Sequence, residues 1–413
     1  MRPTGRLHIG HYFGALQNWV KLQNDPSYNC FYFIADWHAM TSDYADTSAI
    51  AQNSIEIATD WLASGLDPEK SVLFLQSLVP EHAELHLLLS MVAPLGWLER
   101  IPTYKEQLDN IKDKDLHTYG FLGYPVLQCA DIVIYGESDV PLIVPVGEDQ
   151  VSHVEFAREI VRKFNFHFAG IGVFRSIMTK ENQKYLGHVA LHLAREGFPT
   201  EGFLEFTGVE DSLVPDRLGV YAQQLAGKIG YENFLEKMGA AQQFFVVRSV
   251  LQEPAAELTH TPRIPGTDGR KMSKSYGNFI SLSESDESIR AKTKTMMTDP
   301  ARKRRTDVGD PEKCPAYDWH KLFSPPDTLE WAAQGCRTAG IGCIECKAKM
   351  AEHLIRWIEP VRARRQEYEK HPGRVLEIVD AGSKKARKVA QETMARVREA
   401  VFGWEKKRAE VGK

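Results

Sequence analysis

The sequence predicts an α/β fold in which a doubly wound, Rossmann-like parallel sheet occupies the first part of the chain. Short apolar runs with strand-like composition alternate there with segments of helical spacing. The strand-like runs are residues 29–35, 71–78 and 142–146. The helical segments are residues 47–64, 81–92 and 151–164. Because such alternation forms parallel sheets that bind ligands at the carboxyl ends of their strands, we expect a ligand site there.

The length of the chain, 413 residues, is too great for one compact core, so we expect two or three domains. Residues 1–165 and 250–283 are assigned to the Rossmann-like domain. Residues 166–249 are expected to form an inserted, mostly helical segment. Residues 284–413 are expected to form a C-terminal helical domain, apart from a Pro- and Cys-bearing stretch at about 307–346.

The inserted segment carries helical patterns and no catalytic motif. The patterns are residues 182–196, 217–228 and 233–243. The segment has 8 Lys and Arg against 9 Asp and Glu, and this near neutrality argues against a main RNA-binding role. We therefore expect it to pack on the body of the protein or against a second subunit.

Net charge and hydropathy limit the partners and the location that can be expected for the chain. The net charge is −4, but residues 361–413 hold 15 Lys and Arg against 8 Asp and Glu. A basic tail on an acidic body suits a polyanion such as a nucleic acid, although a solvated helix face would look the same. No run approaches about eighteen uncharged apolar residues, and no apolar signal segment opens the chain. A cytoplasmic protein without a membrane partner is expected.

The first chemical motif is TGRLHIGH at residues 4–11. Gly10 would let a nucleotide approach the backbone where a side chain would block it. A helical pattern follows over residues 12–21, so the motif lies at a helix start, which favours phosphate. His8 and His11 could donate hydrogen bonds to phosphate oxygens as charge builds in a transition state. By itself, such a motif is also compatible with chance histidines at a helix start.

The second motif is KMSKS at residues 271–275. It lies within a Gly-, Lys- and Ser-rich loop, residues 262–281, and is flanked by Gly266, Gly269 and Gly277. Mobile ammonium groups could follow a departing pyrophosphate. The alternative is a solvated basic loop.

Together, in this order and on this fold class, the motifs resemble the HIGH and KMSKS signatures of class I aminoacyl-tRNA synthetases. Segments between them resemble the tryptophanyl-tRNA synthetases in particular: DWHAMT at 36–41, WLERIPTYK at 97–105, YPVLQCADI at 124–132 and VPVGEDQ at 144–150. The resemblance covers residues 1–165 and 250–413. It implies a HUP-type Rossmann-like catalytic domain and a tRNA-binding helical domain.

The resemblance implies a two-step reaction with Mg²⁺ and ATP. Tryptophan is first activated to tryptophanyl-adenylate and then transferred to the terminal adenosine of tRNA(Trp), by a homodimer. The implied catalytic residues are His8, His11, Lys271 and Lys274. The implied ATP-binding residues are Arg2, Pro3, Thr4, Gly10, His11, Gly147, Glu148, Asp149, Ile264, Lys271, Met272, Ser273, Lys274 and Ser275.

The resemblance also implies a tryptophan pocket in which Asp131 accepts the indole N–H. Indole has one donor and no acceptor, and a buried carboxylate rejects a ligand that cannot donate. The other implied pocket residues are His38, Gln128, Val144, Val146 and Gln150. Three alternatives stay open: tyrosine specificity, a catalytically silent relative that binds tRNA or tryptophan, and a nucleotidyltransferase with another substrate.

Four of the six cysteines suggest a metal site. Cys30 and Cys129 fall in apolar runs and are expected to be buried. The others, Cys314, Cys336, Cys343 and Cys346, are separated by 21, 6 and 2 residues. A CxxC with two further thiols suits zinc or a [4Fe–4S] cluster, and spacing does not separate these metals. The resemblance favours the cluster, because some bacterial tryptophanyl-tRNA synthetases carry one on similar spacing.

Near Met1 the sequence departs from the family pattern. Family members have an apolar strand before the RPTG turn, whereas here Met1 adjoins that turn. We expect the strand to be absent, which would expose core and abolish activity.

Overall fold

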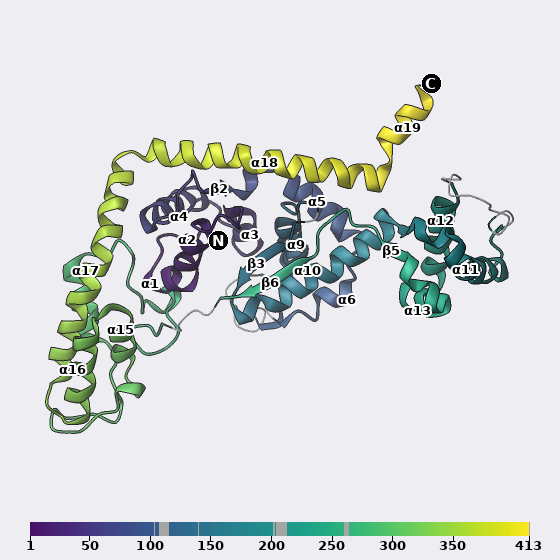
Figure 1. The fold of residues 1–413 in the computed structure, drawn as a ribbon. Coiled ribbons are helices and arrows are strands. Elements are labelled where there is room, and N and C mark those ends of the chain that lie inside the picture. Colours follow the sequence, from purple (N-terminus) through teal and green to yellow (C-terminus); the bar gives the residue numbers. More distant parts are fainter. Residues whose placement is uncertain are drawn as a thin grey trace. The chain divides into compact units, whose positions relative to one another are not determined.

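The computed structural model divides into two compact units (Figure 1). Unit 1 is Met1–Pro80, Ile111–Phe121 and Leu258–Lys388. Unit 2 is Glu81–Asn110, Leu122–Glu257 and Val389–Lys413. The structure describes residues 1–102, 104–106, 115–138, 140–200, 203, 213–259 and 264–412. The domain boundaries expected from motifs and composition stay a prediction.

Unit 1 contains the expected parallel βαβ arrangement. Strand β1 (Cys30–Ile34) pairs in parallel with β2 (Ser71–Leu75), in register from Cys30 with Ser71 to Ile34 with Leu75. Helices α3 (Asp36–Asp43) and α4 (Ile50–Ser64) lie between them in the chain. This confirms the Rossmann-like fold class for the part of the sheet in this unit.

Two predicted boundaries in unit 1 were wrong by a few residues. The second apolar run leaves the strand at Leu75 and turns through a 3₁₀ helix, η2 (Gln76–Leu78). The cause is Asp36, whose carboxylate accepts the backbone N–H of Ser77 at 3.0 Å. Helix α4 starts at Ile50 because the Asp46 carboxylate caps the preceding turn, accepting the N–H of Ser48 at 3.0 Å.

The amino-terminal helix begins within the first motif, three residues before the predicted start at residue 12. It is built from α1 (Ile9–His11), a π-helical turn, η1 (Tyr12–Leu16), and α2 (Gln17–Gln23). His8 stands at its N-cap with extended backbone. The motif therefore lies at a helix start, as the sequence indicated.

The C-terminal half is helical, including the stretch that we expected to be irregular. The stretch 307–346 contains η9 (Pro311–Lys313), α15 (Pro315–Phe323) and α16 (Pro326–Arg337). Each helix opens on a proline, which is tolerated at the first helical position because its missing N–H would have no partner there. The other helices are α14 (Asp286–Thr295), α17 (Cys343–Lys370), α18 (Pro372–Phe402) and α19 (Trp404–Val411).

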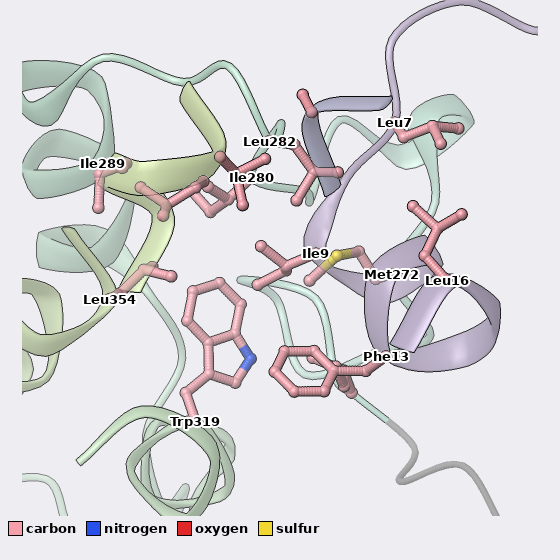
Figure 2. Close-up of a cluster of buried hydrophobic side chains, with 14 of the residues drawn as sticks. Leu7, Ile9, Phe13, Leu16, Met272, Ile280, Leu282, Ile289, Trp319 and Leu354 are labelled. Atoms are coloured by element: carbon pink, nitrogen blue, oxygen red, sulfur yellow. The ribbon is translucent and has the colours of Figure 1, made fainter. Parts of the chain in front are cut away.

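One apolar core in unit 1 joins both motifs to the C-terminal helices (Figure 2). Leu7 and Ile9 of the first motif and Met272 of the second lie in it beside Trp319 of α15 and Leu354 of α17. All five are at most 6% exposed, so this core fixes the two motif segments on the helical region.

Unit 2 holds the other part of the α/β region. Its helices include α5 (Glu81–Ser90), α6 (Leu95–Leu98), α9 (Tyr124–Val133) and α10 (Val151–Phe164). The short helix α8 (Tyr119–Leu122) precedes α9 in the chain, and all of its residues except Leu122 belong to unit 1. Strand β3 (Leu142–Val146) pairs with β6 (Pro254–Leu258), and η3 (Glu148–Gln150) follows β3.

The inserted segment has a hydrophobic core of its own. Its α-helices are α11 (Gln183–Arg195), α12 (Leu213–Ile229) and α13 (Tyr231–Met238). Short turns of other helical types are η4 (Asn165–Ala169), η5 (Arg175–Met178), η6 (Lys180–Asn182) and η7 (Gly239–Phe244). An antiparallel pair, β4 (Ile171–Val173) with β5 (Phe245–Val247), was not predicted. Helix α13 ends earlier than predicted because Gly239 turns the backbone to a φ of +52°.

None of the helices in the described ranges is long and apolar enough to cross a membrane.

Candidate active site

The first motif brings two neutral imidazoles into contact. The ring centroids of His8 and His11 are 3.7 Å apart, and the His11 Nδ1 accepts the backbone N–H of His8 at 3.2 Å. Burial, with the charges of His11 and Lys274, lowers the pKa of His8 to about 3. Burial and Lys274 lower the pKa of His11 to about 4. Both rings are therefore uncharged at neutral pH. Each can then donate a hydrogen bond through one ring nitrogen and accept one at the other.

Gly10 packs closely against His8 of its own motif and against Met272 of the second motif. A Cβ at this position would lie 3.0 Å from the His8 ring and 3.4 Å from the Met272 sulfur. Met272 is 6% exposed and packs in the same core as Ile264, another predicted nucleotide-site residue. Residues of the two motifs therefore pack against each other around Gly10.

Backbone hydrogen bonds join the two segments. The N–H of Ile9 donates to the carbonyl of Ile280 at 3.0 Å, and the N–H of Leu282 donates to the carbonyl of Leu7 at 2.9 Å. Lys274 adds a side-chain link, because its Nζ donates to the carbonyl oxygens of Thr4 at 2.9 Å and Gly5 at 2.8 Å. The Lys274 ammonium therefore links the KMSKS loop to the Thr4–Gly5 turn of the first motif.

Asn278 holds the KMSKS loop, and nothing in the sequence pattern pointed to it. It is 3% exposed, and its Oδ1 accepts the N–H of Ser273 at 2.8 Å. Its Nδ2 donates to Asp268 Oδ1 at 2.7 Å and to the Lys271 carbonyl at 3.1 Å. A Cβ at Gly266 would lie 2.3 Å from that amide nitrogen, so the glycine makes room for the brace.

A polar cavity of about 410 Å³ lies beside Lys274 in unit 1. Three cationic side chains line it, with one carboxylate and four hydroxyl groups. The lining residues are Thr4, Arg6, Lys274, Phe279, Ser281, Ser283, Glu284, Ser285 and Lys292. This lining suits an anionic group better than an apolar one.

The other predicted residues of this unit lie on the same segments. Arg2 donates to the Ser42 hydroxyl and stands 3.5 Å from the Asp43 carboxylate. Pro3 is buried, whereas Lys271 and Ser275 of the loop are exposed.

Asp131 in unit 2 is buried and hydrogen-bonded. It is 2% exposed on α9, and its Oδ1 lies 2.6 Å from the Nδ1 of His82 on α5. The other ring nitrogen of His82 lies 2.6 Å from the Tyr135 hydroxyl. Burial and the Asp131 charge raise the pKa of Tyr135, so Tyr135 stays protonated and can donate. His82 and Tyr135 were missed, since neither stands in a motif with a chemical signature.

The remaining predicted residues of unit 2 surround that helix in sequence. Gln128 precedes Asp131 by one helical turn on α9. Val144 and Val146 alternate along β3, both half-buried, and therefore face the same side of the strand. Gly147 caps η3, which contains Glu148 and ends at Gln150; the side chain of Asp149 lies outside the described residues.

Comparisons with known proteins identify the family to which the chain belongs. A family model described as tRNA synthetases class I (W and Y) matches residues 1–185 and 233–359. A tryptophan–tRNA ligase of Ralstonia nicotianae is 46% identical over 409 residues, covering 97% of this chain and 96% of that protein. The one of Thermotoga maritima is 41% identical over 402 residues, covering 97% of each. The chain belongs to the class I tryptophanyl-tRNA synthetase family.

A solved family member has the same fold. The crystal structure of tryptophanyl-tRNA synthetase from Campylobacter jejuni, complexed with ADP and tryptophan, gives a TM-score of 0.70 at 30% identity. The match covers 97% of this chain and 98% of that one. The family model leaves residues 186–232 and 360–413 unmatched, and the first of these stretches lies within the inserted segment.

The predicted substrate-site residues are divided between the two units. His38 on α3 and the two signature motifs are in unit 1, while Asp131, Gln150 and the segment around Gly147 are in unit 2. Each unit shows its own share of the predicted residues. The assignment of the complete sets to ATP and tryptophan stays a prediction.

The four C-terminal cysteines share one neighbourhood. Cys314 is the N-cap of α15, Cys336 lies near the end of α16, and Cys343 and Cys346 lie in the first turn of α17. Burial and the other three thiols raise the pKa of Cys346 to about 12. Among the described residues, no group of three or more His, Cys, Asp or Glu side chains is placed to hold a metal ion.

Cys30 and Cys129 are buried, as expected for cysteines in apolar runs.

Proposed function

We propose that this chain activates L-tryptophan with ATP and transfers it to tRNA(Trp), using the residues of both signature motifs. The observation that carries the proposal is the contact of Lys274 with the Thr4–Gly5 turn, beside two histidines and Gly10. In the first step a carboxylate oxygen of tryptophan attacks the α-phosphorus of Mg·ATP, and pyrophosphate leaves. In the second step a ribose hydroxyl of the tRNA attacks the activated carbonyl, and AMP leaves.

The ATP side of the proposal uses positioning and charge. The nucleotide lies against Gly10, Ile264 and Met272, since these residues form a close-packed surface without a polar side chain. Lys274 exchanges its carbonyl partners for phosphate oxygens, which stabilises the charge that develops on pyrophosphate. Lys271 is exposed and joins from the same loop. Mg²⁺ would enter with ATP as part of the substrate and supply further positive charge to the phosphates, and no covalent enzyme intermediate forms.

The further ATP-binding residues that we propose are Arg2, Pro3, Thr4, His8, His11, Ser273 and Ser275 in unit 1, and Gly147, Glu148 and Asp149 in unit 2.

The tryptophan side uses Asp131 as the acceptor of the indole N–H. Its burial supports this assignment, because a carboxylate away from water discriminates strongly against a ligand that has no donor. His82 supports it further, since the hydrogen bond at 2.6 Å fixes the carboxylate from the side of α5. His38, Gln128, Val144, Val146 and Gln150 complete the proposed pocket.

The test is tryptophan-dependent ATP–pyrophosphate exchange, with tyrosine and phenylalanine as competing substrates. We expect exchange with tryptophan alone. Asp131→Asn should raise the KM for tryptophan at least about tenfold, since a hydrogen bond to a charged group is worth about 1.5–3 kcal/mol. Glu155→Gln on the exposed side of α10 is the control. Exchange with tyrosine, or an unchanged KM in Asp131→Asn, would contradict the proposal.

The C-terminal region, residues 284–413, is proposed to bind the tRNA. Its last part carries the excess of Lys and Arg, on α18 and α19. Charge neutralisation of phosphates predicts a steep loss of tRNA affinity with salt, whereas pyrophosphate exchange should change little. Filter binding of tRNA(Trp) across a salt series measures the difference.

We also propose that Cys314, Cys336, Cys343 and Cys346 hold a [4Fe–4S] cluster, with zinc as the alternative. Burial and neighbouring thiols raise the pKa values of Cys314, Cys336 and Cys346, which supports a shared site. Two cations stand beside it. The Arg302 charge opposes the burial that raises the pKa of Cys336, and the charges of three of the thiols oppose the burial that lowers the pKa of Lys347. These charges would offset part of the charge of a four-thiolate site. Among the described residues the thiols are not placed to hold a metal ion, so binding of the group would have to draw them closer together. A cluster would supply structural support between the helices and no step of the reaction.

Iron, acid-labile sulfide and zinc per chain should be measured on anaerobically purified protein. Four irons and four sulfides are expected of the cluster, and their loss in Cys346→Ser would assign it. Zinc instead would select the alternative, and neither metal would remove the proposal.

A cytoplasmic homodimer is proposed from the family resemblance, and sedimentation equilibrium of the purified chain tests the dimer.

A further inference from the structure

A buried ionic network holds the backbone just before the HIGH histidines. Arg365 on α17 is 1% exposed and donates to the carboxylates of Asp60 and Glu56 on α4. Asp60 is fully buried, and its Oδ2 accepts the backbone N–H of Leu7 at 2.6 Å. The carbonyl of Leu7 in turn accepts the N–H of Leu282 at 2.9 Å. The peptide groups on both sides of Leu7 are therefore fixed.

Arg6 ties the preceding residue into the same network. Its Nε donates to Glu56 at 3.0 Å, and another guanidinium nitrogen lies 3.4 Å from Glu369. Glu369 also accepts from the Nε of Arg365 at 3.1 Å, so the two arginines share two carboxylates. The turn that carries the motif is thus joined to α4 and α17 through charged groups on all three segments.

Stability does not account for this network. Burial outweighs Arg365 and raises the pKa of the Asp60 carboxyl to about 6, above its ordinary value. Stability from such a group is present at low pH and is lost as the pH rises through about 6. Apolar residues of similar volume would stabilise the fold as well or better. What the charged pair adds is a fixed direction for each hydrogen bond.

Asp60 also acts on the catalytic lysine. Burial lowers the pKa of Lys274, and the Asp60 charge opposes that shift. An ionised Asp60 therefore helps to keep the Lys274 ammonium protonated while it stands beside the Thr4–Gly5 turn.

We propose that Asp60 and Arg365 are positioning residues for the activation step: Asp60 fixes Leu7, and hence His8, while Arg365 from α17 fixes Asp60. The inference rests on the proposed function of the HIGH and KMSKS residues. It gives a helix of the proposed tRNA-binding region a direct hydrogen-bonded route to the catalytic turn.

The proposal has a pH signature. His8 and His11, with pKa values of about 3 and about 4, stay neutral above about pH 5, so Asp60 is the group of this network that titrates near pH 6. When Asp60 takes up a proton, its pull on Leu7 and Lys274 weakens and activity falls. The charged groups that face it are Arg365 and Glu369 from α17, Glu56 from α4, Arg6 and Lys274.

The experiment compares Asp60→Asn, Arg365→Gln and Arg365→Lys with the wild type in pyrophosphate exchange between about pH 5 and pH 8. We expect Asp60→Asn and Arg365→Gln to lower kcat at least about tenfold, with the KM for ATP changed less than about threefold. Asp60→Asn should lack the acid limb near pH 6. Arg365→Gln should move that limb to higher pH, and Arg365→Lys should recover part of kcat.

Arg364→Gln is the matched control. Arg364 also lies on α17 and reaches α4, but its Nε donates to the Ala63 carbonyl at 2.6 Å and not to the motif turn. A variant with a lowered melting temperature but wild-type kcat per active site and an unmoved acid limb would overturn the proposal. So would an Arg364→Gln variant as defective as Arg365→Gln.

Amide hydrogen exchange of the peptide containing Leu7 separates this proposal from the proposed function. Protection should fall in Arg365→Gln and hold in Arg364→Gln, whether or not the wild type shows exchange with tryptophan. Unchanged protection of the Leu7 peptide in Arg365→Gln would overturn the positioning role of Asp60 and Arg365. Absent pyrophosphate exchange in the wild type would instead overturn the proposed function.

Discussion

The hydrogen-bond partners of Lys274 in this structure are ones that a bound nucleotide could replace. Its ammonium is bound by the carbonyls of Thr4 and Gly5, which are neutral acceptors that phosphate oxygens can replace. Lys274→Met should therefore lower kcat of pyrophosphate exchange about 10²–10³-fold, the usual cost of losing one charge-stabilising group. The melting temperature should change little, because the group is only half-buried.

The matched control is Lys294→Met on the exposed face of α14. It should keep wild-type exchange, and an equal loss in both variants would contradict a specific role for Lys274.

His82 offers a test of the buried carboxylate without changing it. In His82→Asn the amide can keep a hydrogen-bond donor at the former position of Nδ1, facing Asp131. In His82→Gln the longer side chain can keep a polar group only at the former position of Nε2, facing the Tyr135 hydroxyl. We expect His82→Gln to raise the KM for tryptophan about tenfold and His82→Asn to raise it less. The KM for ATP serves as the internal control. Equal effects of both variants would show that the Asp131 contact is not the one that matters.

Single residues were predictable where chemistry demanded a residue type. Gly10, His8 and Lys274 stand in motifs, and the structure brings them together. Asp60, Asn278 and His82 were not predictable, because each acts through partners distant in the chain, which spacing along one sequence does not reveal.

The conformation of the KMSKS loop depends on the lack of a side chain at Gly266. A Cβ at Gly266 would lie 2.3 Å from Asn278 Nδ2 and 2.7 Å from its carbonyl oxygen. Gly266→Ala should displace the Asn278 brace, and we expect a loss of about 1–3 kcal/mol in the free energy of unfolding and a lower kcat. Urea denaturation and pyrophosphate exchange measure the two effects.

Gly373→Ala is the control for that variant. It lies in the first turn of α18, where a Cβ would meet no atom within 4 Å. Unchanged or slightly raised stability is expected there, and a neutral Gly266→Ala would show that the loop can move without cost.

Elements were predicted best where the apolar period was unbroken. The strand at Cys30–Ile34 and the helix at Val151–Phe164 lie where the sequence placed them. The errors fell where side-chain capping decides a boundary, as Asp36 does after β2, or where proline starts a helix, as Pro315 and Pro326 do. The spacing of apolar residues does not reveal side-chain caps or a proline that starts a helix.

At the scale of the whole molecule, helix α17 connects two of the proposals. Its first turn carries Cys343 and Cys346, and its last part carries Arg365. At 1.5 Å per residue these ends are about 30 Å apart along the helix. Support of the first turn by a metal group would therefore also steady the helix that fixes Asp60, so both features favour one rigid helical body beneath the HIGH turn.

The inserted segment is the part of the molecule that should be separable from catalysis. Its core is its own, with Phe203, Leu218 and Phe234 fully buried within it. Its ends meet, because β4 pairs with β5 and the N–H of Arg248 donates to the Gly170 carbonyl at 2.9 Å. Replacing residues 171–247 by a short Gly-Ser linker should therefore leave the remaining fold closed.

Asn165 explains why that closure should survive the deletion. It is 4% exposed, its Oδ1 accepts the N–H groups of Val250 and Leu251 at 3.0 and 3.1 Å, and its Nδ2 donates to the Leu251 carbonyl. All of these groups lie outside the deleted residues. We expect kcat of pyrophosphate exchange to stay within about threefold of the wild type, and the isolated segment to unfold cooperatively as a domain of marginal size. A deletion variant that folds but loses exchange would make the segment part of the catalytic machinery.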